Sequence, residues 1–333
     1  MKKGLLIGKF MPPHKGHLAL IDFARKNCDE LDVAVCSRPE EPILGKLRFL
    51  WMKKMLAPCG KIKVARIKAD LPQGKGSSRP TSKAWGKYLT KRFGKIDVIF
   101  TSEKYGDYLA EYMGIEHMSF DPKRKTVPVS ATKIRNNPLF FWNYIPDIVR
   151  PYFVKKICIY GPESTGKTTL AKGLAEHYKT EWIPEYARVW IEKNGFAFTY
   201  ADIARFGRGQ VRIENEAARR ANRFLFCDTD SITTLVYSRE YFKKVPPLVE
   251  NLAGINRFDL YLFTEIDLPW KEDKLRDLGH KRREMRNVFM NELLKRKIPF
   301  EIVRGRGLER LKAAVRAIDR HFGIRQKLST SPS

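Results

Sequence analysis

Apolar segments of strand length alternate with amphipathic segments of helical length along the chain. The apolar run 4–8 opens the first half, and after it Leu18, Ile21 and Ala24 recur at the spacing that places them on one face of a helix. The pattern further predicts strands at 31–36, 61–67 and 97–101 and a helix at 46–56. Strands that alternate with helices are typical of a parallel sheet with crossover helices.

The same alternation starts again after residue 150. Pro146 and Pro151 bracket a short segment, which predicts a junction between two domains. The second half is expected to contain strands at 156–160, 224–227, 260–263 and 299–303 and helices at 169–178 and 201–222. The polar segment 72–82 has no apolar period and is predicted to be an exposed loop. The predicted division of the chain is a first domain at 1–145, a linker at 146–155, a second domain at 156–325 and a polar tail at 326–333.

The clearest motif is GPESTGKT at 161–168, which matches G-x-x-x-x-G-K-[ST] between an apolar strand and a helix. Glycines let such a loop curl so that its N–H groups face phosphates, and the helix N-terminus adds a favourable dipole. We expect Lys167 to reach the β- and γ-phosphates of ATP and the hydroxyl of Thr168 to bind Mg²⁺. ATP contacts are predicted at Gly161, Glu163, Ser164, Thr165, Gly166, Lys167, Thr168 and Thr169.

Two further pairs of residues are candidates for the same phosphate site. Asp228 and Asp230 follow an apolar strand, where open α/β sheets place their ligands, and either can serve the metal; a turn or helix cap is the alternative. Arg283 and Arg286 lie three residues apart on one face of a predicted helix. They can close over the transferred phosphate, or they can belong to a solvated basic face.

A pair of histidines follows the first strand. In GKFMPPHKGH at 8–17, His14 and His17 lie at the start of a helix and face the same way. Histidines there can donate hydrogen bonds to a triphosphate and stabilise charge on its α-phosphoryl group. The alternatives are a helix cap with a surface imidazole, or a metal pair, for which no third ligand of matching spacing is evident.

The segment VSATKIR at 129–135 carries hydroxyls and cations at the start of another predicted helix. Such an arrangement suits an anion, and it strengthens the prediction of a nucleotide site in the first half. An ordinary helix cap followed by basic residues is the alternative.

Composition limits the classes of protein that fit. Hydrophobic residues at 43% and aromatic residues at 12% are enough for a packed core, which excludes a disordered chain. Apolar runs fall short of the ~20 residues of a membrane span. The five cysteines form no C-x-x-C pair and indicate reduced thiols, so we expect a cytoplasmic protein. The net charge of +27 suggests nucleic acid, but the excess is spread over both halves.

These motifs, in this order, resemble a known family. GKFMPPHKGH is similar to the nucleotidylyltransferase signature G-x-F-x-P-x-H-x-G-H, and VSATKIR resembles the second signature, I-S-x-T-x-I-R. Followed by a P-loop, they resemble the NadR type of bifunctional protein, which joins a nicotinamide mononucleotide adenylyltransferase to a ribosylnicotinamide kinase. The similarity runs from residue 4 to about 320. It implies an α/β protein of NAD biosynthesis, with a Rossmann-like nucleotidylyltransferase domain before a P-loop kinase domain and mainly parallel sheets in both.

In the first domain, the resemblance implies that nicotinamide mononucleotide attacks the α-phosphorus of ATP in line, giving NAD and pyrophosphate. The catalytic residues are then His14, His17 and Arg135. Implied ATP contacts are Gly8, Lys9, Phe10, His14, His17, Ser130, Thr132 and Arg135. Of the two tryptophans in the substrate region, Trp51 and Trp85, we favour Trp85 for stacking on the pyridinium ring, with core packing as the alternative.

In the second domain, the resemblance implies transfer of the γ-phosphoryl group of ATP to the 5′-hydroxyl of ribosylnicotinamide. Mg²⁺ is then held by Thr168 and Asp228, and the base is Glu185 or Asp230. The implied catalytic set, in which the arginines belong to a lid, is Lys167, Glu185, Asp230, Arg283 and Arg286. Implied substrate contacts are Trp85 in the first domain and Glu185, Tyr186, Arg188, Asp228, Asp267 and Trp270 in the second.

Some family members carry an N-terminal helix-turn-helix and act as repressors. Here the first strand begins at Gly4, so we expect neither that domain nor specific DNA binding. Two other functions are alternatives: a bifunctional coenzyme A synthase-like enzyme, and a nucleic-acid-binding NTPase or regulator. No membrane partner is expected, and a homo-oligomer is compatible with the resemblance because enzymes with the HxGH motif often form one.

Overall fold

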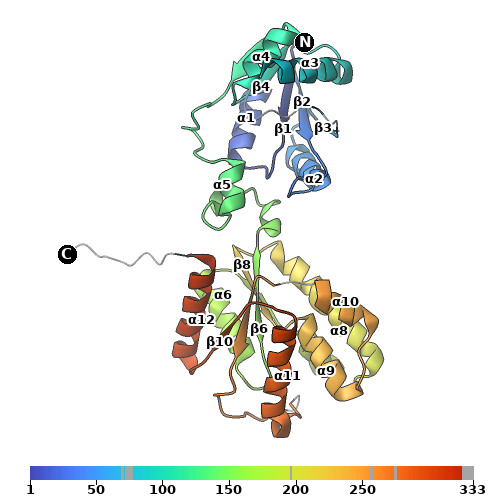
Figure 1. Cartoon of the computed structure of the whole chain (residues 1–333), viewed down its shortest axis with the longest axis vertical. Helices are drawn as coiled ribbons and strands as arrows, with labels where there is room; N and C mark the ends of the chain where they lie inside the picture. The colour runs from blue at the N-terminus through green and yellow to red at the C-terminus, as the bar shows by residue number, and fades with distance from the viewer. Residues whose placement is uncertain (69–70, 72–77, 196, 256–257, 274–275, 325–333) are drawn as a thin grey trace, which may run out of the picture. The chain divides into compact units, whose positions relative to one another are not determined.

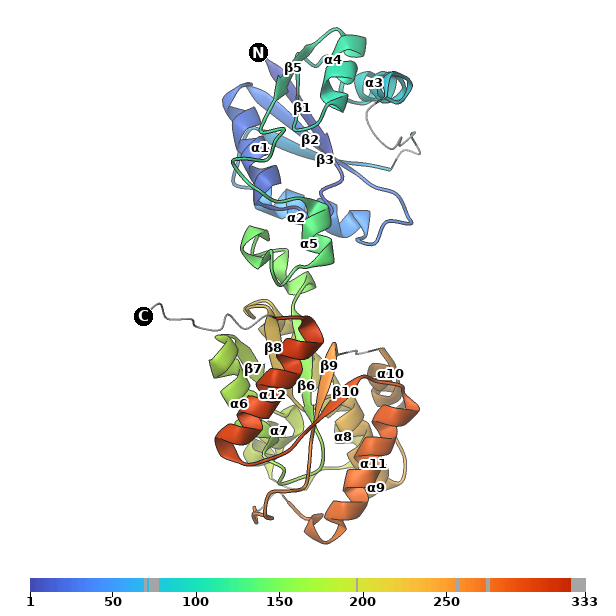
Figure 2. The same ribbon diagram turned by 60° about the vertical axis from the view of Figure 1, so that its left-hand side comes forward.

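The chain forms two compact units, Met1–Phe153 and Val154–Ser333, each with its own sheet. The computed structural model in Figures 1 and 2 describes residues 1–68, 71, 78–195, 197–255, 258–273 and 276–324. The predicted tail at 326–333 lies outside the described residues, as does the part of the predicted loop at 72–77.

The first unit is a parallel sheet with helices on both faces. In chain order its elements are β1 (Lys3–Gly8), α1 (Lys15–Lys26), β2 (Glu30–Cys36), α2 (Gly45–Leu56), β3 (Ile62–Ile67), α3 (Arg79–Phe93), β4 (Val98–Thr101), α4 (Tyr105–Met113), β5 (Glu116–Ser119) and α5 (Ala131–Asn136). The strands run in the order β3-β2-β1-β4-β5. The order reverses between β1 and β4, and open α/β sheets bind their ligands at such a point.

Alternate residues of the central strands pack on opposite faces of this sheet. Leu6 and Phe100 contact the side covered by α1 and α2, whereas Leu5 and Ile99 contact the side covered by α3 and α4. Because both faces are covered, these strands are apolar along their whole length. The core thus fixes the β1–α1 connection at the carboxyl edge of the sheet.

The second unit repeats the parallel design. Its elements are β6 (Lys155–Tyr160), α6 (Lys167–Tyr178), β7 (Glu181–Ile183), α7 (Tyr186–Asn194), α8 (Tyr200–Ala218), β8 (Phe224–Asp228), α9 (Ser231–Phe242), α10 (Pro247–Ile255), β9 (Leu260–Thr264), α11 (Arg282–Lys295), β10 (Phe300–Val303) and α12 (Gly307–Phe322). The strand order is β10-β9-β6-β8-β7, all parallel. Helices α6 and α12 lie on one face, and α8, α9 and α11 lie on the other (Figure 1).

The observed elements confirm the predicted α/β class and the parallel sheets, but two of the predicted segments have the wrong bounds. The expected loop at 72–82 is wrong for its last four residues, because α3 begins at Arg79 with Ser78 as its cap and Pro80 in its first turn, a position that tolerates proline. The helix expected at 201–222 ends at Ala218, four residues early. Short 3₁₀ turns at Trp142–Tyr144 and Arg150–Tyr152 precede the division between the units.

Candidate functional site

The β1–α1 loop brings both predicted histidines into one cavity of the first unit. The N–H of Gly16 donates to Nδ1 of His14 at 3.1 Å, so the His14 side chain caps α1. The imidazole rings of His14 and His17 stack with centroids 3.7 Å apart, and Phe10 meets His17 edge-on at 5.0 Å. A Cβ on Gly16 would lie 3.0 Å from the His14 ring, which explains a glycine between the histidines.

Both imidazoles are neutral at pH 7. Burial, aided by the nearby charge of Arg124, lowers the pKa of His14 to about 4. Burial, His14 and Arg124 also lower the pKa of His17. Because Nδ1 of neutral His14 accepts a hydrogen bond, its proton resides on Nε2, which makes this nitrogen a donor. Within the described part of the chain, no group of three potential ligands is placed to hold a metal ion. The two histidines therefore fit phosphate binding better than metal binding.

Helix α5 ties the second predicted segment to the same loop. Ser130 caps α5 by accepting from the N–H of Lys133 at 3.2 Å. The guanidinium of Arg135 donates to Oγ1 of Thr132 at 3.1 Å and to the carbonyl of Met11 in the β1–α1 loop. Two motifs more than a hundred residues apart in the sequence therefore form one site.

The cavity has a volume of about 630 Å³ and includes most of the predicted residues. Of the sequence-predicted residues, those that line it are Gly8, Lys9, Phe10, His14, His17, Trp85, Ser130, Thr132 and Arg135. Trp51 instead lies in the core and packs edge-on against Tyr152 at 5.5 Å. Arg124 also lines the cavity and was missed by the sequence analysis, because it lies outside both signatures.

A buried arginine supports the floor of this cavity. Arg48 is 0% exposed and donates to the carbonyls of Ile43 at 2.8 Å, Cys36 at 3.0 Å and Lys9, while its other nitrogen pairs with Glu41. It thereby joins the ends of β1 and β2. Arg48 was also missed, since a single arginine in an amphipathic helix carries no signal of burial.

The second cavity surrounds the phosphate loop of the second unit. Left-handed backbone at Ser164 and Gly166 curls the loop before α6. The ammonium group of Lys167 donates to the carbonyl of Pro162 at 2.8 Å, and the hydroxyl of Thr165 bonds the hydroxyl of Thr264 on β9 at 2.7 Å. This cavity of about 170 Å³ is lined by Glu163 to Thr169, and also by Glu185, Arg188 and Asp228.

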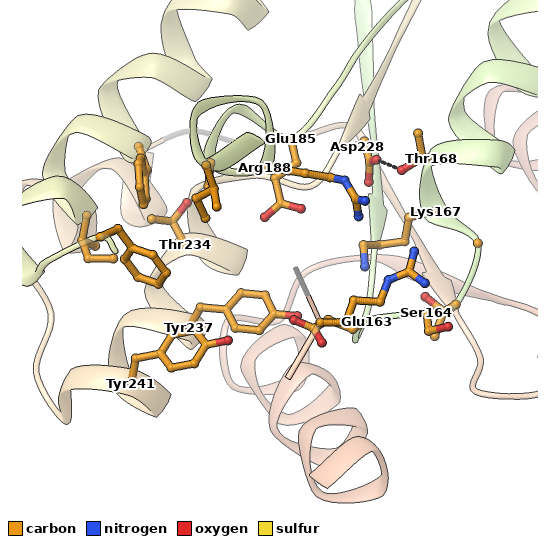
Figure 3. A pocket seen from close by; sticks show the side chains of 18 of the residues that line it. Glu163, Ser164, Lys167, Thr168, Glu185, Arg188, Asp228, Thr234, Tyr237 and Tyr241 are labelled. Carbon is orange, nitrogen blue, oxygen red and sulfur yellow. Dashed lines mark hydrogen bonds between the residues drawn. The ribbon is translucent and has the colours of Figure 1, made fainter. Parts of the chain in front are cut away.

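The pair formed by Thr168 and Asp228 fits a hard cation. Thr168 donates to Oδ2 of Asp228, and Oδ1 of Asp228 is buried with no hydrogen-bond partner among the described residues (Figure 3). A hydroxyl and a carboxylate with a free oxygen are the ligands that Mg²⁺ takes beside phosphates. Burial raises the pKa of Asp228, and a bound cation would oppose that rise.

The two candidate bases of the kinase reaction occupy different environments. Glu185 lines the cavity, and burial together with the charge of Asp228 raises its pKa to about 7. Asp230 is buried outside the cavity lining, where it accepts from Thr233 at 2.9 Å and from the hydroxyl of Tyr261 at 2.7 Å. The geometry therefore favours Glu185 at the cavity and gives Asp230 the cap of α9.

The structure separates the remaining predicted residues into two groups. Arg188 lines the cavity and pairs with Glu192 and Asp273. The others lie outside the cavity lining. Tyr186 packs against α8, Asp267 pairs with Arg310, and Trp270 lies beside Gly279 and Arg282. Arg286 donates two hydrogen bonds to Glu265, and Arg283 is exposed.

Other basic residues contact the phosphate loop in their place. Arg282 donates to the carbonyl of Ser164 at 3.0 Å, and buried Arg310 donates to the carbonyl of Thr165. Arg276 lines the cavity itself. The sequence analysis favoured the neighbouring Arg283 because it shares a helical face with Arg286. In the structure, α11 instead presents Arg282 to the loop. Arg310 follows the glycines of the β10–α12 turn, a signal that the sequence analysis left unused.

Similarity to known proteins extends over most of the chain. The trifunctional NAD biosynthesis/regulator protein NadR of Escherichia coli K12 is 32% identical over 327 residues, which cover 89% of this chain and 77% of that protein. The chain belongs to the NadR family. The NadR of Salmonella typhimurium LT2 is 30% identical with the same coverage. Residues 156–310 also match a family described as an AAA domain.

One relative with a single activity matches part of the chain, and a solved structure has the same fold over nearly all of it. The nicotinamide-nucleotide adenylyltransferase of Pyrococcus furiosus is 27% identical over 141 residues, 40% of this chain and 72% of that enzyme. A crystal structure of a NadR protein in complex with NR has the same fold, with a TM-score of 0.80, 24% identity and 97% of each chain covered.

NadR membership confirms the predicted role in NAD biosynthesis and the prediction of an enzyme that combines nicotinamide mononucleotide adenylyltransferase with ribosylnicotinamide kinase. The two parallel sheets and the solved structure confirm the predicted α/β fold. Within the described ranges, no helix is both long and apolar enough to cross a membrane.

Proposed function

We propose that the two cavities are the two active sites of a pathway from ribosylnicotinamide to NAD. Ribosylnicotinamide is phosphorylated by ATP in the cavity at the phosphate loop. The resulting mononucleotide then receives the AMP group of a second ATP in the cavity at the histidine pair. The observation that carries this proposal is the assembly of HxGH, α5 and Arg135 around one cavity, in a chain whose second cavity surrounds a P-loop. The adenylyltransferase and kinase domains then occupy 1–145 and 156–325, and an enzyme that uses ATP twice is proposed to work in the cytoplasm.

At the first site, positioning and charge stabilisation perform the chemistry. The phosphate of nicotinamide mononucleotide attacks the α-phosphorus of ATP, the bond to the β-phosphate breaks, and pyrophosphate leaves with the electron pair. His14 donates from Nε2 to the phosphate oxygens, and Arg135 and Arg124 bring positive charge to the same cavity. Trp85 lines the cavity and supplies an aromatic face for the pyridinium ring.

At the second site, Glu185 is the proposed base. It accepts the proton of the ribose 5′-hydroxyl as that oxygen attacks the γ-phosphorus of ATP, while ADP leaves. A carboxyl with a pKa of about 7 is suited to this transfer near neutral pH. Lys167 and the loop N–H groups balance charge on the phosphates, and Arg188 lies within reach of the same space.

Mg²⁺ is the proposed metal of the second site. Thr168 and Asp228 would hold it, and when bound it would neutralise charge on the phosphates of ATP. The other proposed contacts with ATP come from the backbone of Gly161 to Thr169.

The proposal is tested by mass-spectrometric analysis of products formed from ATP, Mg²⁺ and each candidate substrate. We expect nicotinamide mononucleotide and NAD from ribosylnicotinamide, and NAD with pyrophosphate from nicotinamide mononucleotide. Formation of dephospho-CoA from phosphopantetheine, with no NAD from nicotinamide mononucleotide, would instead support the coenzyme A synthase alternative.

A further inference from the structure

The cavity of the second unit has two chemically different ends. Lys167, Thr168 and Asp228 form a polar end, where the phosphate loop meets the sheet (Figure 3). Apolar and aromatic side chains form the other end: Ala187, Ile191, Phe198, Ile203, Phe206, Tyr237 and Tyr241. The polar end suits a triphosphate, so the aromatic end is where a planar ring attached to the ribose would lie.

Glu163 places an acidic side chain in a loop whose backbone N–H groups are suited to bind anions. It is the third residue of the GPESTGKT motif, yet its side chain extends into the cavity (Figure 3). One of its carboxyl oxygens is buried with no partner among the described residues. Burial raises the pKa of Glu163 to about 7. The charges of Lys167 and Arg276 oppose this rise without cancelling it. A carboxylate so placed is unfavourable beside phosphates, and a positive charge on the second substrate would stabilise it.

Glu163 and two tyrosines belong to the same part of the cavity. Tyr237 and Tyr241 lie one turn apart on α9, and their rings are nearly parallel with centroids 6.1 Å apart. The pKa of Tyr237 is raised by burial and then by the charges of Glu163 and Glu185, which places both carboxyl groups within electrostatic reach of this phenol. Aromatic faces next to carboxylates attract an organic cation and disfavour an anion.

We propose that Glu163, together with Tyr237 and Tyr241, makes the kinase site selective for a riboside whose ring carries a positive charge. This inference rests on the proposed ribosylnicotinamide kinase function and assigns Glu163 to the nucleoside instead of to ATP. The oxidised pyridinium riboside is then the preferred substrate. Its 1,4-dihydro form, which has a neutral ring, and the nicotinate riboside, whose carboxylate adds a negative charge, are poorer substrates.

The test compares kcat/KM for these three ribosides in the full-length protein and in Glu163→Gln, which removes the charge but retains hydrogen-bonding groups. We expect the wild type to prefer the pyridinium riboside to its dihydro form by about tenfold or more, the size of a partly desolvated cation–π and charge contact. In Glu163→Gln the pyridinium value falls by about tenfold, the dihydro value stays constant, and the KM for ATP is unchanged. Glu163→Asp retains most of the preference.

Glu176→Gln is the matched control, because it removes the same charge from an exposed position on α6. It should leave the substrate ratio unchanged. An equal loss for the pyridinium and dihydro ribosides in Glu163→Gln would overturn the inference and assign Glu163 to a ribose hydroxyl or to positioning of the phosphate loop. The absence of a preference in the wild type would overturn it as well. A wild type that phosphorylates none of the three ribosides would refute the proposed function itself.

Discussion

The acidic side chains near the kinase cavity differ in their partners, and the partners decide what each one can do. Asp228 shares one oxygen with Thr168 and has the other free, which suits a cation. Asp230 has its carboxylate occupied by Thr233 and Tyr261. Glu185 faces the cavity with a raised pKa. Acidic residues are thus suited to different roles because burial and hydrogen bonding differ: Asp230 caps α9, whereas Asp228 and Glu185 are the proposed ligand and base.

The raised pKa of Glu185 gives the kinase reaction a specific pH dependence. The carboxylate is the active form, so kcat/KM for ribosylnicotinamide should fall as the pH drops below about 7. Glu185→Gln should lower kcat by about 10²–10⁴-fold, and in a Glu163→Gln background, where the other carboxyl with a pKa of about 7 is absent, it should abolish this inflection. Steady-state assays between pH 5.5 and 8.5 measure both effects. Asp230→Asn is the control: it should reduce stability but retain the inflection, and an inflection that vanishes in this variant instead would assign the base to Asp230.

The histidines of the first unit should resist protonation. Burial lowers the pKa of His14 to about 4, so its ring is expected to remain neutral down to about pH 5 in the free protein. Burial also lowers the pKa of His17 well below its usual range. NMR titration of the ring carbons measures this directly. His280, whose side chain is exposed, serves as an internal control in the same spectra. A midpoint near 6.5 for His14 would contradict the buried, neutral pair.

At the scale of elements, periodicity predicted the central strands because both faces of each sheet are covered and the runs are apolar. It missed β7 and β5, which have three and four residues and sit at sheet edges. It also could not separate Asp228 from Asp230. The chain leaves β8 at Asp228, and Thr229 adopts a left-handed conformation with φ 72° that the sequence does not announce. The motifs located the two cavities that are the candidate sites, whereas contacts made by single buried arginines could be seen only in the fold.

Arg48 shows how one element supports the nucleotide loop. Arg48→Ala removes the buried partner of Glu41, which retains its pair with Lys9 and the N–H of Arg38. It also leaves the carbonyls of Lys9 and Cys36 without this donor. The free energy of unfolding of the first unit should therefore fall by about 3 kcal/mol. Hydrogen exchange of the β1 and β2 amides, followed by mass spectrometry, reports this unit separately. Arg25→Ala breaks only an exposed pair with Asp22 and should cost under about 1 kcal/mol. Equal protection in the two variants would refute the supporting role of Arg48.

At the scale of the whole molecule, each candidate site is complete within its own unit. The described residues that line the cavity at the histidine pair lie between Leu6 and Arg135, and those that line the cavity at the phosphate loop lie between Glu163 and Arg276. The net charge of +27 is explained only in part by the two candidate sites. Among the described residues, Lys9, Arg124 and Arg135 line the first cavity and Lys167, Arg188 and Arg276 line the second, so the two candidate sites account for only a small part of the excess.

Because each site is complete, the two activities should be separable by single substitutions. His17→Ala should lower adenylyl transfer by about 10²–10³-fold and leave ribosylnicotinamide phosphorylation unchanged, since it removes a group from the first cavity alone. Lys167→Ala should do the reverse. Separate assays of NAD formation from nicotinamide mononucleotide and of ADP formation with ribosylnicotinamide measure the two effects, and each variant is the control for the other.

Mixing the two variants provides the decisive version of this experiment. Neither alone should convert ribosylnicotinamide to NAD, because each lacks one step. In the mixture, nicotinamide mononucleotide made by His17→Ala is released into solution and can enter the intact first cavity of Lys167→Ala, so NAD formation should return. If a folded single variant lost both activities, or if the mixture stayed inactive while each partial reaction proceeded, the two steps would depend on a shared or internally coupled site, and two independent cavities would be the wrong description.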